Sequence, residues 1–306
     1  MSQVALVTGA ARGIGAATVR GLAAAGWNVL AVDRCADDPA LPYSLGTREE
    51  LDRVAAEAAA AAAGAPGAAV APGSAGSGRG AAAGRRGTAG GPGTAGGPGP
   101  AAGGPGAVVV READVRDPAA LARAVAAAER QWGGLDAAIA AAGVIAGGVP
   151  LWEMPEDQQR AVLDIDLGGV LALARAAVPA LLRRPPPRSG RFLAVASAAA
   201  TRGLPMLAAY CAAKAGVAGL IRALAVELRD SGVTANAVSP GSTDTPMLAE
   251  SARLYSLPGR DSFASQQPLG RLVSPDEVAA ALVWLAGPGS SGMTGAVVPV
   301  DCGLAL

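Results

Sequence analysis

Residues 8–15 constrain the fold of this chain more than any other segment. They read TGAARGIG and stand between an apolar run at 3–8 and a helical pattern at 14–25. A strand that turns through glycines into a helix gathers backbone N–H groups and the positive end of the helix dipole at one point, where a pyrophosphate can bind. An ordinary glycine turn would not need an acid about 20 residues further on, and Asp33 stands there. The segment therefore predicts a strand and a helix that bind a dinucleotide.

Asp33 also indicates which dinucleotide is bound. At the end of the second strand, its carboxylate can accept hydrogen bonds from both ribose hydroxyls and would repel a 2′-phosphate, which favours NAD. Arg12 and Arg34 are counter-evidence, because either guanidinium could hold a 2′-phosphate. We predict NAD and keep NADP as the alternative.

Strand and helix signals alternate along the rest of the chain. Thr47 and Glu50 form a capping box that opens one helix, and the strands are apolar, as buried parallel strands are. The pattern predicts an α/β fold, a Rossmann-like doubly wound sheet of seven mostly parallel strands with helices on both faces. The further predicted strands cover 28–32, 107–111, 135–141, 191–196, 233–239 and 297–300, and the further helices cover 47–60, 118–131, 156–182, 207–229 and 275–286.

Residues 64–106 interrupt this pattern. They consist almost entirely of Ala, Gly and Pro with scattered Ser, Thr and Arg, and they lack the large apolar side chains that bury a core. The strand and helix pattern resumes beyond them. We therefore expect residues 1–306 to form one dinucleotide-binding domain that carries a disordered insertion at 64–106.

Composition excludes several classes of function. The formal net charge is zero, so no overall field attracts nucleic acid or an anionic membrane. No uncharged run of bulky apolar residues reaches the roughly 20 that a membrane span needs. The chain has no histidine, which excludes Ser-His-Asp triads and His-based zinc sites, and we expect no metal. Three distant cysteines favour a reducing compartment, so we predict a cytoplasmic protein that acts on small molecules.

Lys214 is the only lysine in the chain. An exposed ion pair accepts arginine equally well, whereas a compact ammonium is needed where chemistry occurs close by. Tyr210 lies four residues earlier, and positions i and i+4 share one face of a helix. A nearby cation lowers the pKa of a tyrosine, which could then serve as a general acid or base. Taken alone, such a pair could also be a surface accident.

Together these motifs resemble the short-chain dehydrogenase/reductase family. The resemblance rests on the glycine motif at 8–15, on Ser197, Tyr210 and Lys214, and on Pro240-Gly241 after a strand, and it covers essentially the whole chain outside the insertion. It implies that Tyr210 is the catalytic acid/base, that Lys214 holds the nicotinamide ribose and lowers the tyrosine pKa, and that Ser197 binds the substrate oxygen. Hydride would move between the carbinol carbon and NAD while the tyrosine moves the hydroxyl proton.

The resemblance also implies which positions contact the cofactor. Asp114 and Val115 would lie at the adenine, and the loop after Pro240 would hold the nicotinamide. Asp-Val and Pro-Gly pairs are common at strand ends, so these assignments depend on the resemblance. With the glycine motif and the tyrosine–lysine pair, the candidate cofactor-binding residues are Gly9, Arg12, Gly13, Ile14, Gly15, Asp33, Arg34, Asp114, Val115, Ala142, Gly143, Tyr210, Lys214, Pro240, Gly241, Thr243 and Thr245.

Two positions depart from the family pattern. Ala140-Ala141-Ala142-Gly143 stands where the family has Asn-Asn-Ala-Gly, which removes side-chain amides that brace the sheet but leaves backbone contacts to the cofactor. Asp166 stands where the family has a catalytic asparagine. It could hold a relay water near Lys214, but an ionised carboxylate cannot donate a hydrogen bond, and it would pair with the lysine. Asp166 is therefore a candidate catalytic residue, with a structural helix residue as the alternative.

A finer resemblance concerns residues 32–53, an extended segment that contains Asp33-Arg34-Cys35, Pro39, Pro42 and Tyr43. It is similar to the mycofactocin-associated, carveol-dehydrogenase-like subfamily. Members of that subfamily are thought to keep NAD bound during turnover and to pass electrons to mycofactocin, a peptide-derived redox cofactor. The segment could cover the adenosine.

The segment at 246–268 lies where the family has its substrate lid. Its bulky side chains favour a small hydrophobic alcohol or ketone as substrate, and the alternative is that they fill a core. Cys211 points about 100° away from its neighbour Tyr210 on a helix, so we expect it to pack. The bulky residues of the lid segment are Met247, Leu248, Leu254, Tyr255, Leu257 and Phe263.

The sequence thus predicts an NAD-dependent oxidoreductase that interconverts a secondary alcohol and a ketone, with mycofactocin as a candidate electron acceptor. The alternative is a non-catalytic dinucleotide-binding sensor or scaffold that uses residues 64–106 as an interaction arm. Neither reading involves nucleic acid or a membrane. The family resemblance further implies a homodimer or homotetramer, formed through the helices at 156–182 and 207–229.

Overall fold

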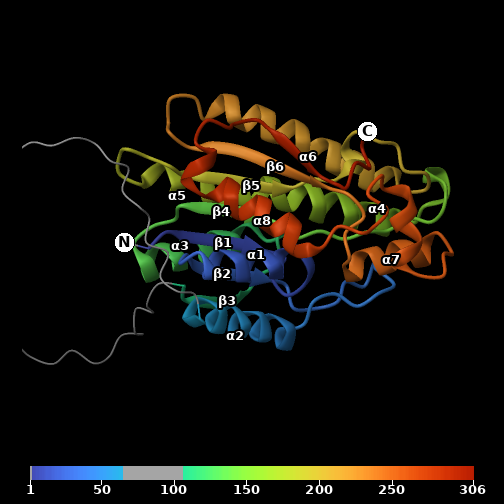
Figure 1. Cartoon of the computed structure of the whole chain (residues 1–306), viewed down its shortest axis with the longest axis horizontal. Coiled ribbons are helices and arrows are strands. Elements are labelled where there is room, and N and C mark those ends of the chain that lie inside the picture. The colour runs from blue at the N-terminus through green and yellow to red at the C-terminus, as the bar shows by residue number, and fades with distance from the viewer. Residues whose placement is uncertain (1, 65–105) are drawn as a thin grey trace, which may run out of the picture.

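The computed structural model describes residues 2–64 and 106–306, so the predicted insertion lies almost wholly outside the described residues. Seven strands form one parallel sheet in the order β3-β2-β1-β4-β5-β6-β7 (Figure 1). This confirms the predicted Rossmann-like fold. The strands are β1 (Val4–Thr8), β2 (Asn28–Asp33), β3 (Val108–Glu112), β4 (Ala137–Ala140), β5 (Arg191–Val195), β6 (Thr234–Pro240) and β7 (Val297–Val300).

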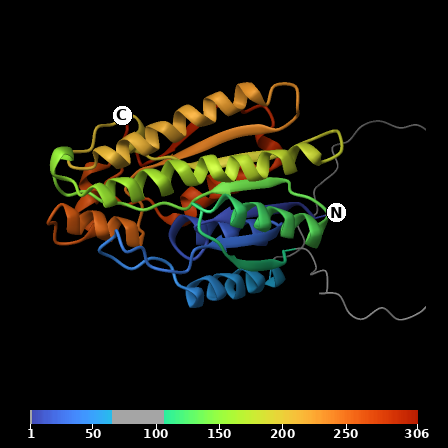
Figure 2. The same ribbon diagram turned by 180° about the vertical axis from the view of Figure 1, so that it is seen from behind.

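Helices cover both faces of the sheet, as Figure 1 and Figure 2 show from opposite sides. Side chains that alternate along the strands supply two cores: Leu6 and Leu30 pack with one helical layer, and Ala5 and Val29 pack with the other. The first layer contains α3 (Pro118–Trp132), α4 (Glu156–Leu163), α5 (Gly169–Arg183) and α6 (Ala208–Glu227), and the second contains α1 (Gly13–Ala24), α2 (Arg48–Gly64) and α8 (Pro275–Ala286).

Two elements differ from the sequence-based expectation. The helix predicted at 156–182 is divided by a π-helical turn, Asp164–Gly168, which hydrophobic periodicity does not reveal. The lid segment contains an unpredicted helix, α7 (Pro246–Leu254), which begins with a proline and a Thr245 cap. The capping box at Thr47 is present, since Glu50 N–H donates to Thr47 Oγ1 at 3.2 Å and Thr47 N–H donates to Glu50 Oε2 at 2.9 Å.

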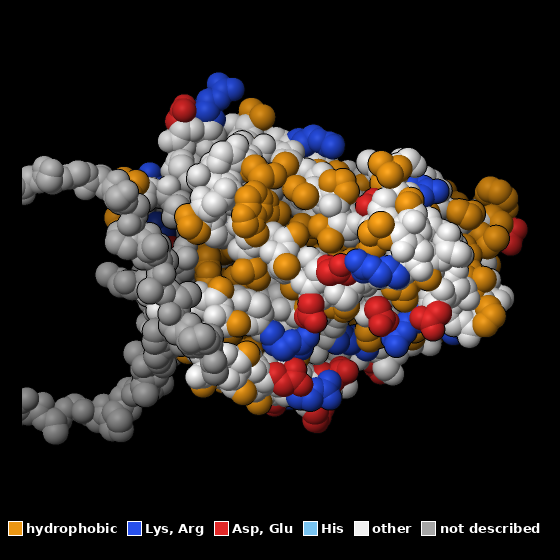
Figure 3. Space-filling model, in the orientation of Figure 1, with side chains coloured by type: hydrophobic (Ala, Val, Ile, Leu, Met, Phe, Trp, Pro, Cys, Tyr) orange, Lys and Arg blue, Asp and Glu red, His pale blue; other side chains and the backbone are white. Residues whose placement is uncertain are grey.

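The apolar helices of the chain pack on its own sheet. Two described stretches, Glu156–Arg183 and Ala208–Glu227, are long and apolar enough to cross a membrane by length and composition alone. Both contribute buried residues to the core, among them Leu173 and Ile221, so tertiary packing accounts for their hydropathy. On the face seen in Figure 3, acidic and basic side chains are interspersed, in keeping with a formal net charge of zero.

Candidate active site

A cavity of about 650 Å³ lies along the edge of the sheet where the parallel strands end. Segments that follow all seven strands supply its wall, which is where ligands bind in open sheets of this kind. Every residue that the sequence marks as catalytic or cofactor-binding lines this cavity, with the single exception of Asp166. Sequence positions that lie up to 236 residues apart, Gly9 to Thr245, thus meet in one site.

The glycine motif forms one end of the cavity and fits a pyrophosphate. Gly9 has a φ of +69°, and a Cβ there would lie 2.6 Å from backbone atoms of Ala142. A Cβ on Gly15 would lie 2.0 Å from the Gly9 carbonyl oxygen, so neither position accepts a side chain. Helix α1 begins here without a side-chain cap on its first N–H groups. These N–H groups can therefore bind an anion.

Asp33 stands beside this end with a fixed carboxylate. Its Oδ2 accepts a hydrogen bond from Ala11 N–H at 3.0 Å, and its Oδ1 accepts one from Cys35 N–H at 3.2 Å. Arg12 lies on the other side but donates to the Ser44 carbonyl at 2.7 Å. The carboxylate, and not the guanidinium, is therefore the group oriented to receive ribose hydroxyls.

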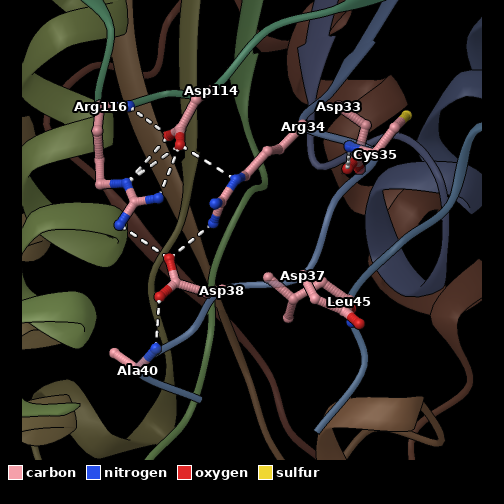
Figure 4. Close-up of polar contacts among 9 residues, drawn as sticks. All are labelled: Asp33, Arg34, Cys35, Asp37, Asp38, Ala40, Leu45, Asp114 and Arg116. Atoms are coloured by element: carbon pink, nitrogen blue, oxygen red, sulfur yellow. Dashed lines mark hydrogen bonds and ion pairs between the residues drawn. The ribbon is translucent and has the colours of Figure 1, made fainter.

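Arg34 belongs to a four-residue ion cluster with Asp38, Asp114 and Arg116 (Figure 4). Arg34 contacts Asp38 at 2.6 Å and Asp114 at 3.3 Å, while Arg116 contacts the same two acids at 2.9 Å and 2.7 Å. Burial would raise the pKa of Asp38, but the Ala40 N–H and the two guanidinium groups outweigh it and hold that pKa below its usual range. Asp38 and Asp114 thus both carry a negative charge beside Arg34. These two charges neutralise the Arg34 guanidinium and leave it unavailable for a 2′-phosphate.

This arrangement predicts how cofactor selectivity can be changed. Asp33→Ala should weaken NAD binding by about 10- to 100-fold, because hydrogen bonds to a charged group are lost. Asp33→Ala combined with Asp38→Asn should bind NADP at least about 10-fold more tightly than Asp33→Ala alone, because Arg34 is released from one of its acids. Equilibrium titration of the cofactor-free proteins with NAD and NADP measures both effects.

The matched control is Asp33→Ala with Asp37→Asn. Asp37 lies on the same segment but outside the ion cluster, and accepts a hydrogen bond from Leu45 N–H (Figure 4). An equal gain in NADP affinity from both double variants would contradict the role given to the cluster.

Ser197, Tyr210 and Lys214 lie together at the other end of the cavity. Ser197 follows β5 and caps a short turn, where its Oγ accepts a hydrogen bond from Ala199 N–H at 3.1 Å. Tyr210 and Lys214 share one face of α6, with Lys214 Nζ 5.5 Å from the centre of the phenol ring. Lys214 Nζ also donates to the Val195 carbonyl at 3.2 Å, which ties the helix to the end of β5.

Asp166 lies behind this wall and contacts the lysine directly. It occupies the π-helical turn and is fully buried, with Oδ2 3.2 Å from Lys214 Nζ. Its Oδ1 accepts a hydrogen bond from Val144 N–H at 2.8 Å. Asp166 does not line the cavity, and its charged contact is with Lys214.

Burial changes the pKa values of Tyr210 and Lys214. Burial raises the pKa of Tyr210, and the lowering by Lys214 is too small to reverse this, partly because Asp166 acts against it. Burial alone would lower the pKa of Lys214, but the charge of Asp166 and the phenol raise it, so the lysine stays protonated. Lys214 thus lowers the pKa of the tyrosine, as the sequence suggested, but burial of the phenol outweighs this lowering.

Two residues that were not among the candidate site residues, Thr8 and Gln267, support the site. The Thr8 hydroxyl accepts hydrogen bonds from Ala141 and Ala142 N–H at 3.3 and 3.4 Å, and so braces the sheet where the family has amides. Gln267 is buried, and its Oε1 accepts a hydrogen bond from Ser242 N–H at 3.0 Å, which fixes the loop after β6. A threonine and a glutamine carry no local signal of such roles, since their partners are distant in sequence.

The substrate end of the cavity is largely apolar. Leu204 and Leu207 line it from the loop before α6, and the lid segment supplies most of the remaining wall. Leu254 is an exception among the lid residues, since it faces a smaller neighbouring cavity. Leu248 and Phe263 also form a small cluster of their own, so part of the lid fills a core. The lid residues in the wall are Pro246, Met247, Leu248, Ser251, Tyr255, Leu257, Phe263 and Gln266.

Two family models match the chain. Residues 100–305 match the model described as enoyl-(acyl carrier protein) reductase, and residues 3–61 match the model described as short chain dehydrogenase. The two matches together cover both sides of the predicted insertion.

Known proteins resemble the chain over most of its length. It is 32% identical to a (−)-trans-carveol dehydrogenase of Rhodococcus erythropolis, over 99% of this chain and 98% of the relative. It is 38% identical to a cis-4-hydroxycyclohexanecarboxylate dehydrogenase of Sinomonas cyclohexanicum, over 62% of this chain and 74% of the relative. The crystal structure of carveol dehydrogenase from Mycobacterium avium in complex with NAD superposes with a TM-score of 0.79 at 30% identity, over 99% of this chain and 97% of that one.

Proposed function

This chain belongs to the short-chain dehydrogenase/reductase family and is an NAD-dependent oxidoreductase, and we propose that it interconverts a secondary alcohol and a ketone. One observation carries the proposal: Ser197, Tyr210 and Lys214 line the same cavity as the glycine motif and Asp33. A dinucleotide bound along this cavity would place its reactive ring beside the phenol.

Each residue of the site has a distinct task in this proposal. NAD, when bound, supplies the hydride acceptor or donor. Ser197 Oγ donates a hydrogen bond to the substrate oxygen, and the Tyr210 phenol takes up or delivers the hydroxyl proton of that oxygen. Lys214 holds the cofactor ribose and keeps a positive charge beside the phenol. Asp166, through its 3.2 Å contact with Nζ, fixes the position of the lysine.

We propose a small hydrophobic alcohol or ketone as the substrate. The apolar wall formed by Leu204, Leu207 and the lid residues supports this, since such a wall binds apolar carbon. The names of two relatives, a carveol dehydrogenase and a hydroxycyclohexanecarboxylate dehydrogenase, point to cyclic alcohols of this kind.

We further propose that NAD stays bound during turnover and that mycofactocin receives its electrons. The segment between β2 and α2 supports the first part. Tyr43, Leu45 and Gly46 line the cavity, the Tyr43 hydroxyl accepts a hydrogen bond from Ile145 N–H at 2.9 Å, and Arg12 holds the Ser44 carbonyl. The ion cluster of Arg34 ties the start of the same segment to residues 114–116 (Figure 4). A cofactor bound beneath this segment could dissociate only after several of these contacts break.

The remaining proposals concern assembly and location. We propose a homodimer or homotetramer in the cytoplasm, without a nucleic-acid or membrane partner, in which the domain carries a disordered insertion at 64–106. Leu171 on α5 and Val226 on α6 are exposed apolar residues that support an interface through these two helices.

Native mass spectrometry of freshly purified protein tests the cofactor and the assembly together. We expect a dimer or tetramer that carries one NAD per subunit after dialysis, and a protein that turns over with an artificial electron acceptor. A cofactor-free protein that binds added NAD reversibly would contradict the retained-cofactor proposal, and a monomer would contradict the oligomer proposal. Denatured mass from the same sample is the control, because it reports the subunit without bound molecules.

A further inference from the structure

The substrate end of the cavity carries a positive charge that no acidic residue neutralises. Arg202 lines the cavity from the loop between the Ala198–Ala200 turn and α6. Among the described residues, the acidic ones in the cavity wall are Asp33 and Asp114, which lie at the ends of β2 and β3. Arg202 is exposed, so its guanidinium can exchange water for an anionic group on a substrate that enters the cavity.

The other cations of the cavity are already occupied. Arg12 donates to the Ser44 carbonyl, Arg34 contacts two acids, and Lys214 contacts Asp166. Within the described residues, the Arg202 guanidinium has no carboxylate within ion-pair distance, and it donates a hydrogen bond to the Leu304 carbonyl. A guanidinium has five N–H donors, so Arg202 can still bind a carboxylate with two parallel hydrogen bonds.

The loop that carries Arg202 is tied to the helix of the catalytic tyrosine. Leu204 N–H donates to Cys211 Sγ at 3.4 Å, and the Cys211 thiol lies 3.8 Å from the Arg202 carbonyl. Cys211 follows Tyr210 directly in α6, and it packs against the core as expected. These contacts fix the position of the Arg202 backbone relative to the Tyr210 phenol.

We propose that this cavity selects hydrophobic alcohols or ketones that carry a carboxylate, and that Arg202 binds this carboxylate. The proposal rests on the proposed function, because it needs the reacting carbon at Ser197 and Tyr210. It adds the charge of the substrate and the residue that recognises it. The other role open to Arg202 is to hold the segment after β7 through Leu304, and the experiment separates the two.

The test compares two substrates on the full-length protein. We measure turnover of cis-4-hydroxycyclohexanecarboxylate and of its uncharged analogue 4-methylcyclohexanol, for the wild type, for Arg202→Gln, and for Arg130→Gln as control. Arg130 is exposed on α3, away from the cavity wall. We expect Arg202→Gln to lower kcat/KM for the carboxylate by about 10- to 100-fold, mainly through KM, and to leave the uncharged alcohol nearly unchanged.

Other outcomes overturn the proposal in distinguishable ways. An equal loss on both substrates would assign Arg202 to holding the segment after β7. Turnover of the uncharged alcohol alone would overturn the carboxylate proposal and leave the proposed function intact. Calorimetric titration with the unreactive cyclohexanecarboxylate gives a readout independent of turnover: saturable binding that Arg202→Gln weakens is expected, and binding equal in both proteins would overturn the proposal.

Discussion

Tyr210→Phe is expected to lower kcat by about 100- to 10,000-fold while NAD binding is retained. The variant removes the hydroxyl that moves the substrate proton, and it keeps the ring that packs beside Lys214 at 5.5 Å. Steady-state kinetics and NAD titration of the same preparation measure the two quantities.

Tyr255→Phe is the matched comparison, because Tyr255 also lines the cavity and donates only to the Pro205 carbonyl, at 2.7 Å. Its loss should be limited to a few-fold, mostly in KM. If Tyr210→Phe kept full activity, the assignment of the acid/base would be wrong. A wild type that bound NAD but turned over no alcohol or ketone would instead favour a non-catalytic sensor.

Lys214→Met is expected to destabilise the protein by about 3–5 kcal/mol at neutral pH, beyond its loss of activity. Lys214 and Asp166 are both buried and lie 3.2 Å apart, so removing the ammonium leaves an uncompensated carboxylate in the core. Asp166→Asn in the same chain should recover much of the loss, because an amide oxygen still accepts the hydrogen bond from Val144 N–H. Urea denaturation of cofactor-free protein, followed by circular dichroism, measures these differences.

The pH dependence of this loss has a definite sign. Burial raises the pKa of Asp166, and without Lys214 nothing of comparable strength opposes it. A carboxyl whose pKa is higher in the folded state than in the unfolded state favours folding when protonated, so the penalty grows as the pH rises above about 4. Lys214→Met should therefore be closer to the wild type at pH 4 than at pH 7. A deficit that did not change with pH, or that Asp166→Asn left in place, would contradict this account.

Arg130→Met serves as the control for removing a cation. Arg130 is exposed on α3, and such surface substitutions change stability by about 0.5 kcal/mol or less. A comparable loss in this variant would show that the effect of Lys214→Met is not specific to the buried pair.

The features that short-range sequence patterns encode could be predicted from the sequence alone. The glycines at 9 and 15, the acid at the end of β2 and the Tyr210–Lys214 spacing each depend on a few neighbouring residues, and the periods of strand and helix place their side chains. For the same reason, the alternation of apolar runs and helical patterns predicted the parallel sheet. Family membership and dependence on NAD followed from these motifs.

Tertiary structure decided how the arginines of the site are paired. Arg34 could have held a 2′-phosphate until its contacts with Asp38 and Asp114 were known. The pairing of Asp166 with Lys214 was expected from the sequence, but the π-helical turn that carries Asp166 was not. The pKa of Tyr210 is likewise set mainly by burial, which no local spacing encodes. Arg202 meets Leu304 across 102 residues. Such contacts depend on how distant segments pack, because the free energy of a charge is set by the groups and the solvent around it and not by its neighbours in sequence.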